Sequence, residues 1–247
     1  MSARNPFAAG YRAAVFGASG GIGAALIEAL QADGQCGAIH AGARNLRPVD
    51  AKVLPFVFDL VDEDSIAAAA HAIAARSPEL DLVIVATGIL HEGALLPEKT
   101  VRALNSAALA RMYAINAIGP ALIAKYLTPL LRRDRKSVFA ALSARVGSIE
   151  DNRLGGWYGY RASKAALNQL IRTCAIEVRT KNKNAVCVTL HPGTVDTRLS
   201  RPFQAAVRPE QLFSAATSAS HLLQLIDELT PAQSGQFLAW DGKPIPF

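Results

Sequence analysis

The stretch RAAVFGASGGIGAALIEAL, residues 12–30, decides the fold. It opens with a short apolar run (12–18), passes through a glycine-rich turn and continues as an Ala/Leu-rich segment. A short apolar run bounded by glycines is typical of a buried strand, and a longer periodic segment is typical of a helix. Gly17, Gly21 and Gly23 allow a tight turn in which backbone N–H groups and the helix N-terminus approach a diphosphate. This stretch therefore predicts a strand, a phosphate-binding turn and a helix.

Short apolar runs and longer Ala/Leu-rich segments alternate along the rest of the chain. We expect strands at 12–18, 36–42, 53–59, 81–87, 136–143, 184–191 and 234–240. We expect helices at 22–32, 65–75, 107–131, 159–180 and 209–229, and no full helix between the second and third strands. This alternation predicts an α/β Rossmann-type fold: one doubly wound, mostly parallel seven-stranded sheet with helices on both faces. No linker or repeat interrupts the chain, so a single domain over residues 1–247 is the simplest organisation.

The composition limits the class of protein. Of the 247 residues, 51% are hydrophobic, which is enough to bury a large core. Cys36, Cys174 and Cys187 are sparse, odd in number and without metal-ligand spacing, which favours a reducing compartment over a disulfide scaffold. The N-terminus has no signal-peptide pattern, and no run of about 18 apolar residues occurs. We expect a cytoplasmic protein that has no membrane span and binds no metal.

The net charge of +6 raises the question of a nucleic-acid partner. The basic residues are scattered, however, and the densest cluster, within 132–136, lies at the end of the long predicted helix. Cations at that end complement the helix dipole. We therefore expect no nucleic-acid binding, while an anionic substrate or a phosphate-rich cofactor suits the sign of the charge.

The stretch WYGYRASK, residues 157–164, holds a candidate catalytic pair. Tyr160 and Lys164 are four residues apart and share one face of a helix, whereas Tyr158 points elsewhere. A neighbouring lysine cation favours the phenolate and lowers a tyrosine pKa from its ordinary value of about 10. That pKa shift would make Tyr160 a useful general acid. Tyr158 is expected to be a packing or pocket-wall residue.

Four motifs follow one another in a characteristic order: the glycine turn, Asn116 in a long helix, Tyr160-x-x-x-Lys164, and the segment 192–197 (PGTVDT). Together they resemble the short-chain dehydrogenase/reductase family over essentially the whole chain. The stretches SARVGS, GGWYGYRASKAALN and SGQFLAWDGKPIPF are similar to its C-factor-like branch. The resemblance implies hydride transfer between a nicotinamide dinucleotide and a carbonyl/alcohol substrate. It also implies a homodimer or homotetramer formed through the long helices.

The resemblance assigns roles to three of these residues. Tyr160 matches the acid–base residue, and Lys164 matches the group that lowers its pKa and binds the nicotinamide ribose. Asn116 matches the asparagine that holds a water for the proton relay.

The family's serine, which orients the substrate carbonyl three residues before a glycine, is missing. Counting back from Gly147 gives Ala144, and Ser143 is one residue early. In a regular strand that shift turns the side chain to the other face. A bulge could bring Ser143 round, Ser148 or Arg145 could substitute, or the site could lack the hydroxyl. Of these we assign Ser143.

The segment after the second strand bears on the choice of dinucleotide. NAD-binding members of the fold usually carry an acidic residue there. Here the strand runs into Ala41-Gly42-Ala43-Arg44-Asn45, without an acid. A guanidinium offers a planar fork suited to a 2′-phosphate, although Arg44 could also be a solvent-facing loop residue. We predict NADP(H) rather than NAD(H).

The remaining cofactor contacts carry over from the family motifs. Asp59 and Leu60 match the position beside the adenine, although Asp59 could instead be a turn or helix N-terminal acid. Val195 and Thr197 should border the carboxamide. The full predicted set is Gly17, Ser19, Gly21, Ile22, Gly23, Arg44, Asp59, Leu60, Gly88, Tyr160, Lys164, Pro192, Gly193, Val195 and Thr197.

The chain also departs from the family before its first glycine and after its fourth strand. Phe16 replaces a usual threonine, and residues 85–88 read Val-Ala-Thr-Gly instead of Asn-Asn-Ala-Gly. We hypothesise that apolar packing replaces a polar tie, because removing both hydrogen-bond partners can be nearly neutral. Trp157 and Phe203 could line a substrate cavity or belong to the core, and segment 199–213 is expected to be its lid.

A binding protein is the rival to an enzyme. A dinucleotide-holding signalling or regulatory member of the family, with little or no turnover, would tolerate Ala144. The intact set of Tyr160, Lys164 and Asn116 favours the enzyme.

Overall fold

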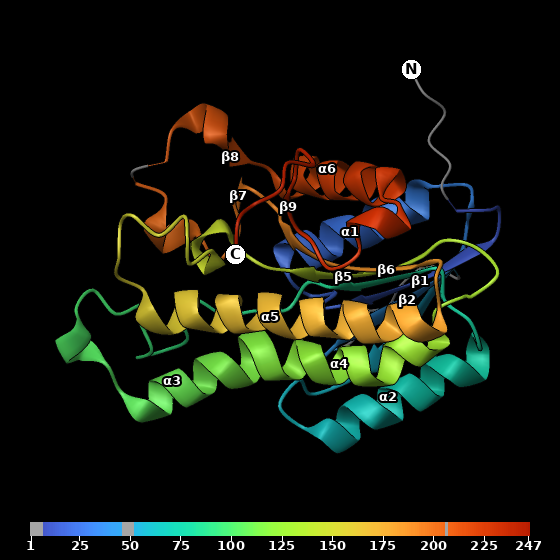
Figure 1. Ribbon diagram of the computed structural model, residues 1–247, viewed down its shortest axis with the longest axis horizontal. Coiled ribbons are helices and arrows are strands. Elements are labelled where there is room, and N and C mark those ends of the chain that lie inside the picture. The colour runs from blue at the N-terminus through green and yellow to red at the C-terminus, as the bar shows by residue number, and fades with distance from the viewer. Residues whose placement is uncertain (1–6, 46–51, 206) are drawn as a thin grey trace.

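A parallel sheet of seven strands runs through the computed structural model, which describes residues 7–45, 52–205 and 207–247 (Figure 1). Its strand order is β3-β2-β1-β4-β5-β6-β9, and every neighbouring pair is parallel. The strands are β1 (Tyr11–Phe16), β2 (Cys36–Ala43), β3 (Val53–Val57), β4 (Leu82–Val85), β5 (Ser137–Leu142), β6 (Ala185–His191) and β9 (Phe237–Ala239). The order changes direction between β1 and β4, which opens a crevice at their carboxyl ends. The predicted doubly wound sheet is confirmed.

Helices cover both faces of this sheet (Figure 1). On one face lie α1 (Gly21–Ala32) and α6 (Ala215–Glu228). On the other lie α2 (Glu63–Arg76), α4 (Gly119–Leu127) and α5 (Tyr158–Lys181). Alternate strand residues belong to opposite cores: Val15 packs with the first pair of helices and Phe16 with the second set. The single-domain α/β architecture expected from the sequence is present.

The apolar segment between β4 and β5 is helical, as predicted, but it is not one regular α-helix. It consists of α3 (Ser106–Tyr113), a π-turn (Ala114–Ile118), α4 and a 3₁₀ turn (Thr128–Leu130). By length and composition alone the span Ser106–Leu130 could cross a membrane, but 44% of its apolar window is buried within the protein. Its contacts with the sheet and α5 are those of a core helix.

The predicted helix 209–229 begins later than expected. Residues Pro209–Gln211 form a 3₁₀ turn, and β8 (Leu212–Phe213) pairs with β7 (Thr194–Val195). Helix α6 starts only at Ala215, where the hydroxyl of Ser214 accepts a hydrogen bond from the N–H of Thr217 at 3.0 Å. The prediction of a helix start at 209 was therefore wrong. The expectation that no full helix joins β2 to β3 concerns residues 46–51, which lie outside the described residues.

Phe16 lies in an aromatic cluster at the end of β1. Its ring centroid is 5.1 Å from those of Phe56 and Phe58, edge-to-face in both cases. All three side chains are buried in the core on the α2 side. The hypothesis that apolar packing surrounds residue 16 is confirmed, and this packing fixes β1 just ahead of the glycine turn.

Replacing Phe16 with alanine should destabilise the protein by about 3–5 kcal/mol, because the surrounding rings cannot close the resulting cavity. Urea unfolding measures this loss. Val57→Ala is the control: Val57 ends β3 with 57% of its surface exposed, so its change should stay within about 0.5 kcal/mol. Equal losses in the two variants would contradict the packing described.

Candidate active site

The glycine turn between β1 and α1 leaves no room for a side chain at three of its glycines. Gly17 has φ +97°, and a Cβ there would lie 2.9 Å from the carbonyl oxygen of Ala86. A Cβ on Gly21 would lie 2.8 Å from Cγ2 of Thr197, and one on Gly23 would collide with the Gly17 carbonyl. The turn is therefore closed against Thr197 on one side and β4 on the other, with its backbone exposed to the crevice.

The N-terminus of α1 carries no side-chain cap. Gly20 occupies the N-cap position, and no acidic residue lies in the first turn of this helix. Its first N–H groups and the positive end of the helix dipole are left for an anion. Together with the bare glycine backbone, this geometry fits a diphosphate.

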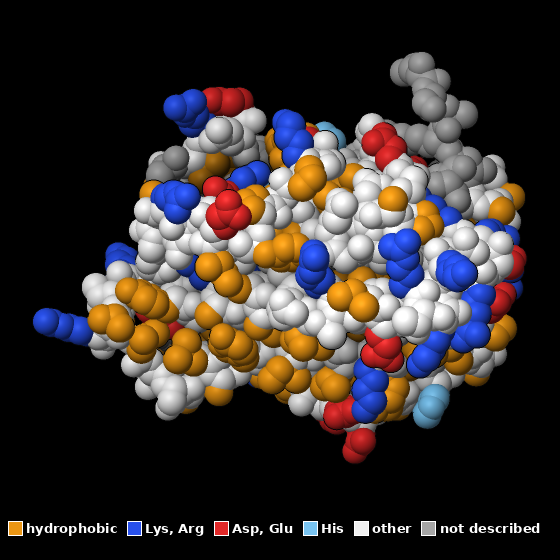
Figure 2. All heavy atoms as spheres, viewed as in Figure 1, with side chains coloured by type: hydrophobic (Ala, Val, Ile, Leu, Met, Phe, Trp, Pro, Cys, Tyr) orange, Lys and Arg blue, Asp and Glu red, His pale blue; other side chains and the backbone are white. Residues whose placement is uncertain are grey.

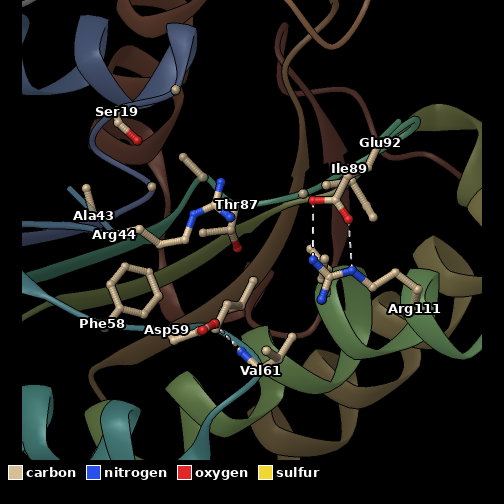
Figure 3. A pocket seen from close by; sticks show the side chains of 16 residues that line it. Ser19, Ala43, Arg44, Phe58, Asp59, Val61, Thr87, Ile89, Glu92 and Arg111 are labelled. Atoms are coloured by element: carbon tan, nitrogen blue, oxygen red, sulfur yellow. Dashed lines mark hydrogen bonds and ion pairs between the residues drawn. The ribbon is translucent and has the colours of Figure 1, made fainter. Parts of the chain in front are cut away.

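A cavity of about 220 Å³ opens beside this turn (Figure 3). Ser19, Arg44, Asp59, Leu60 and Gly88, all predicted cofactor contacts, line it. Arg44 extends from the end of β2 toward Thr87 in Figure 3. The Oγ1 atom of Thr87 is buried and has no hydrogen-bond partner among the described residues. A polar ligand in this cavity would satisfy that atom, and the lining suits the adenosine half of a dinucleotide.

Asp59 has a structural role as well as a place in this cavity. Its carboxylate accepts a hydrogen bond from the N–H of Val61 at 3.1 Å, and its own N–H donates to the Ser65 hydroxyl. The predicted role as a turn residue is therefore present, while the predicted contact with the adenine stays a prediction.

An ion pair on the far rim of this cavity was not foreseen. The guanidinium of Arg111 donates to both carboxylate oxygens of Glu92, at 2.9 and 3.2 Å (Figure 3). The pair links the loop after β4 to α3. No local pattern signals it, because the partners are distant in sequence and neither belongs to a motif.

Tyr160 and Lys164 face each other on the first two turns of α5. Tyr160 is 7% exposed and Lys164 is 3% exposed. The Lys164 Nζ lies 5.9 Å from the centre of the tyrosine ring and donates to the carbonyl oxygen of Leu142 at 2.8 Å. The pair therefore joins α5 to the end of β5. Tyr158 is 39% exposed and does not line the cavity that Tyr160 enters.

Burial governs the ionisation of this pair. It raises the pKa of Tyr160 above its ordinary value and lowers the pKa of Lys164 to about 8. The expectation that the lysine would depress the tyrosine pKa was wrong for this arrangement, because desolvation of the phenolate outweighs the cation's attraction. At neutral pH Tyr160 is a protonated phenol and most Lys164 side chains are still charged.

Asn116 sits in the π-turn, and both its amide oxygen and its amide nitrogen have partners within the protein. Its Oδ1 accepts from the N–H of Ile89 at 2.8 Å. Its Nδ2 donates to the Ile89 carbonyl at 2.9 Å and to the Ser163 hydroxyl at 3.1 Å. Isolated π-turns occur frequently at functional sites. This amide links the loop after β4 to the face of α5 that carries Ser163.

A second cavity, of about 390 Å³, adjoins Tyr160. Its walls are largely apolar and include Trp157, which precedes α5, and Phe203 and Val207 from the predicted lid. The Trp157 ring is edge-to-face with both Tyr160, at 6.2 Å, and Phe203, at 5.1 Å. Ile22, Pro192, Gly193, Val195 and Thr197 from the predicted cofactor set line the same cavity. The glycine turn contributes to both cavities, with Ser19 and Gly20 lining the first and Ile22 lining the second.

The structure shows which polar side chains near Ala144 line the cavity and which are bonded elsewhere. Strand β5 pairs with β6 without a register shift, and the N–H of Ser143 still bonds the Leu190 carbonyl at 2.8 Å, so no bulge occurs there. Both Ser143 and Ala144 nevertheless line the cavity, and Ala144 packs in the cluster that contains Tyr160. The Ser148 hydroxyl instead caps a turn by accepting from the N–H of Asp151. Arg145 lines the cavity but pairs with Asp151 at 2.8 Å.

A buried acid from a distant loop supports the start of α5. The carboxylate of Glu98 accepts from the N–H of Gly159 at 3.0 Å, and its main-chain carbonyl accepts from the N–H of Trp157. Trp157 itself adopts a left-handed conformation, φ 52°, and provides no side-chain cap. Sequence reasoning missed this capping carboxylate, because it lies about sixty residues upstream.

This geometry can be compared with known proteins. The family model described as short chain dehydrogenase matches residues 12–208. The chain belongs to the short-chain dehydrogenase family. Members of this family are oxidoreductases, which agrees with a glycine turn suited to a diphosphate and a buried Tyr–Lys pair in one structure.

Two curated relatives within this family share substantial identity. C-signal from Myxococcus xanthus is 36% identical over 139 residues, covering 56% of this chain and 78% of the relative. This similarity supports the C-factor-like branch. The 1-hydroxy-2-glutathionyl-2-methyl-3-butene dehydrogenase of Rhodococcus sp. (strain AD45) is 34% identical over 188 residues, covering 74% and 76%.

Solved structures share the fold of this short-chain dehydrogenase. An NADPH-bound carbonyl reductase from chicken fatty liver superposes with a TM-score of 0.86 at 24% identity, covering 98% of this chain and 96% of that chain. The carbonyl reductase Sniffer of D. melanogaster gives 0.84 at 23% identity, covering 97% and 100%.

Proposed function

We propose that this chain is an NADP(H)-dependent oxidoreductase that reduces a carbonyl group to an alcohol. The observation that carries the proposal is the buried Tyr160–Lys164 pair, whose tyrosine lines the second cavity. A bound reduced nicotinamide would supply the hydride. The glycine turn, Ser19 and the uncapped N-terminus of α1 would hold the diphosphate, and Lys164 would bind the nicotinamide ribose.

Tyr160 is the proposed general acid. The phenol would give its proton to the carbonyl oxygen of a substrate whose carbonyl carbon takes up the hydride, so that an alcohol forms. The phenolate left behind is stabilised by the Lys164 ammonium until solvent returns a proton. Asn116 would hold a water in that relay. Burial raises the pKa of Tyr160, so the phenol carries a proton to donate at neutral pH.

Ser143 is the proposed hydroxyl that orients the substrate oxygen. Its side chain is 4% exposed, lines the cavity, and its Oγ has no hydrogen-bond partner among the described residues. A buried hydroxyl without a partner costs free energy that a substrate oxygen would recover. Ala144 occupies the position of the family's usual serine and leaves only a methyl group there.

Binding without turnover is the second candidate function. Ala144 favours it, since the hydroxyl expected at that position is absent. In that case the cradle would hold a dinucleotide for signalling or regulation. The two candidates differ in whether NADPH is oxidised, not in whether it binds.

NADP(H) is the proposed dinucleotide. Arg44 lines the first cavity at the end of β2, where the 2′-phosphate of the adenosine ribose would bind. The structural neighbours include an NADPH-bound carbonyl reductase and an NADP-bound protein from Burkholderia multivorans, which supports the choice.

Self-association is part of the same proposal. Figure 2 shows hydrophobic side chains gathered over α3, α4 and α5 on one face. Ile118, Leu170 and Ile176 are 50%, 41% and 66% exposed. A homodimer or homotetramer formed through these helices would bury them. The substrate remains a small carbonyl/alcohol molecule, with no nucleic-acid partner, and the cytoplasmic location stays a prediction.

Replacing Tyr160 with phenylalanine should lower NADPH-dependent reduction of aldehydes and ketones by about 10²–10⁴-fold, because proton donation is lost while packing is kept. The rate of NADPH oxidation, followed by its absorbance across a panel of carbonyl compounds, measures this loss of activity. Tyr158→Phe is the matched control, two residues away and outside the cavity, and should keep full turnover. If the Tyr160→Phe enzyme keeps its activity, Tyr160 is not the general acid. A wild-type protein that binds NADPH but reduces nothing would favour the second candidate.

Replacing Arg44 with alanine should weaken NADPH binding roughly tenfold to a hundredfold, because charge-assisted hydrogen bonds to the 2′-phosphate are lost. NADH binding should not change. Calorimetric titration of both dinucleotides gives the two dissociation constants. Arg111→Ala, on the opposite rim and paired with Glu92, is the control. Tighter binding of NADH than NADPH by the wild type would contradict the proposed preference.

A further inference from the structure

Two buried polar atoms without partners lie on the wall of the Tyr160 cavity. One is the Oγ of Ser143 and the other is the Nδ1 of His191. Neither has a hydrogen-bond partner among the residues that the structure describes. Buried polar atoms are almost always paired in folded proteins. Two orphaned atoms in one cavity therefore indicate a ligand with two hydrogen-bonding groups.

The sheet sets these two residues side by side. Ser143 directly follows Leu142 of β5, and His191 directly follows Leu190, the residue paired with Leu142 in β6. Neighbouring strands are about 4.8 Å apart. Leu142 and Leu190 both pack toward α1 and α6, so alternation turns the next residue of each strand toward α5, where Tyr160 stands. We call Ser143 and His191 the polar floor of the cavity.

His191 is uncharged on this floor. Burial, and to a lesser degree the nearby Arg145, lower its pKa to about 4. At neutral pH the imidazole therefore offers one N–H donor and one acceptor nitrogen rather than a positive charge. Such a group pairs with a neutral hydroxyl or carbonyl oxygen in preference to a carboxylate.

Part of the lining of the same cavity is aromatic. Trp157 and Phe203 meet edge-to-face at 5.1 Å, and Tyr160 stands next to Trp157. Trp157 is fixed by its left-handed backbone and by its N–H bond to the Glu98 carbonyl. Rigid aromatic walls favour flat apolar groups, which stack on them at little entropic cost.

We infer that the substrate carries a second oxygen on the carbon next to the reacting carbonyl, within a flat apolar body: a vicinal diketone or an α-hydroxy ketone. The inference rests on the proposed function. Ser143 holds the reacting oxygen near Tyr160, and His191 holds the neighbouring one. Two donors one strand apart suit oxygens on adjacent carbons. His191 is then a specificity-determining residue that contacts substrate.

Benzil and deoxybenzoin test this assignment, because they differ only in the second carbonyl, which is a methylene in deoxybenzoin. The readout is the ratio of their kcat/KM values with NADPH. Benzil is intrinsically more reactive than deoxybenzoin. The test therefore compares the ratio of kcat/KM values in each variant with the ratio in the wild type. His191→Leu should lower the ratio about tenfold by slowing benzil alone. Ser143→Ala should slow both ketones and leave the ratio nearly unchanged.

His221→Leu is the matched control. Its Nδ1 is also buried and has no hydrogen-bond partner within the described part of the chain, but His221 packs on Trp240 and lies outside the cavity. The ratio should therefore stay at the wild-type value. His191→Met provides a second apolar variant of flexible shape if the leucine variant does not fold. Binding is measured separately, in Tyr160→Phe protein, by quenching of tryptophan fluorescence. Benzil should bind about tenfold more weakly when His191→Leu is added.

The outcomes separate this inference from the function on which it rests. A wild-type enzyme that reduces both ketones with a ratio unaffected by His191→Leu and His191→Met overturns the two-oxygen substrate and leaves the reductase standing. If no carbonyl compound in the panel supports NADPH oxidation by the wild-type protein, the proposed reductase function is overturned. A benzil-specific loss confined to the His191 variants supports both.

Discussion

The hydrogen bond from the buried Lys164 ammonium to the Leu142 carbonyl, at 2.8 Å, is the contact on which the site depends. It fastens the start of α5 to the carboxyl end of β5, and in doing so sets Tyr160 against the cavity. Losing a partner of a buried charge costs more than losing a neutral hydrogen bond, so the lysine has little freedom to leave. The carboxylate of Glu98, from the loop after β4, and the amide of Asn116, from the π-turn, bond the same helix. The site is rigid because α5 is held at several points.

Polarity in the cavity has been rearranged relative to the usual family pattern. Where a serine hydroxyl is expected, Ala144 presents a methyl group to the aromatic cluster. The polar atoms instead lie on the strand ends themselves, at Ser143 and His191. A similar exchange occurs at Phe16, which replaces a polar tie with three packed rings. At Phe16 the buried surface is fully apolar. At Ser143 and His191 the polar atoms are open to a ligand, so neither change leaves a polar atom permanently unpaired.

The parts of this protein that could be predicted are those encoded locally. The strand–glycine–helix unit and the four-residue spacing of Tyr160 and Lys164 depend on short-range geometry, and the structure shows both. Other features depend on contacts distant in sequence. The start of α6 was misplaced because the pairing of β8 with β7 is a tertiary contact. The direction of the Tyr160 pKa shift depends on burial, and the Glu98 cap depends on a distant loop, so neither could be seen in the sequence.

The pH dependence of kcat/KM for NADPH-dependent reduction tests the coupling of the Tyr160–Lys164 pair most directly. With the pKa of Lys164 lowered to about 8, the ammonium that stabilises the phenolate is lost above that pH. The rate should therefore be level in the neutral range and fall as pH rises through about 8. Tyr160, whose pKa burial raises, stays protonated throughout this range. A rate that stays constant until the pH exceeds about 10, the ordinary tyrosine pKa, would show that the lysine does not assist the phenol.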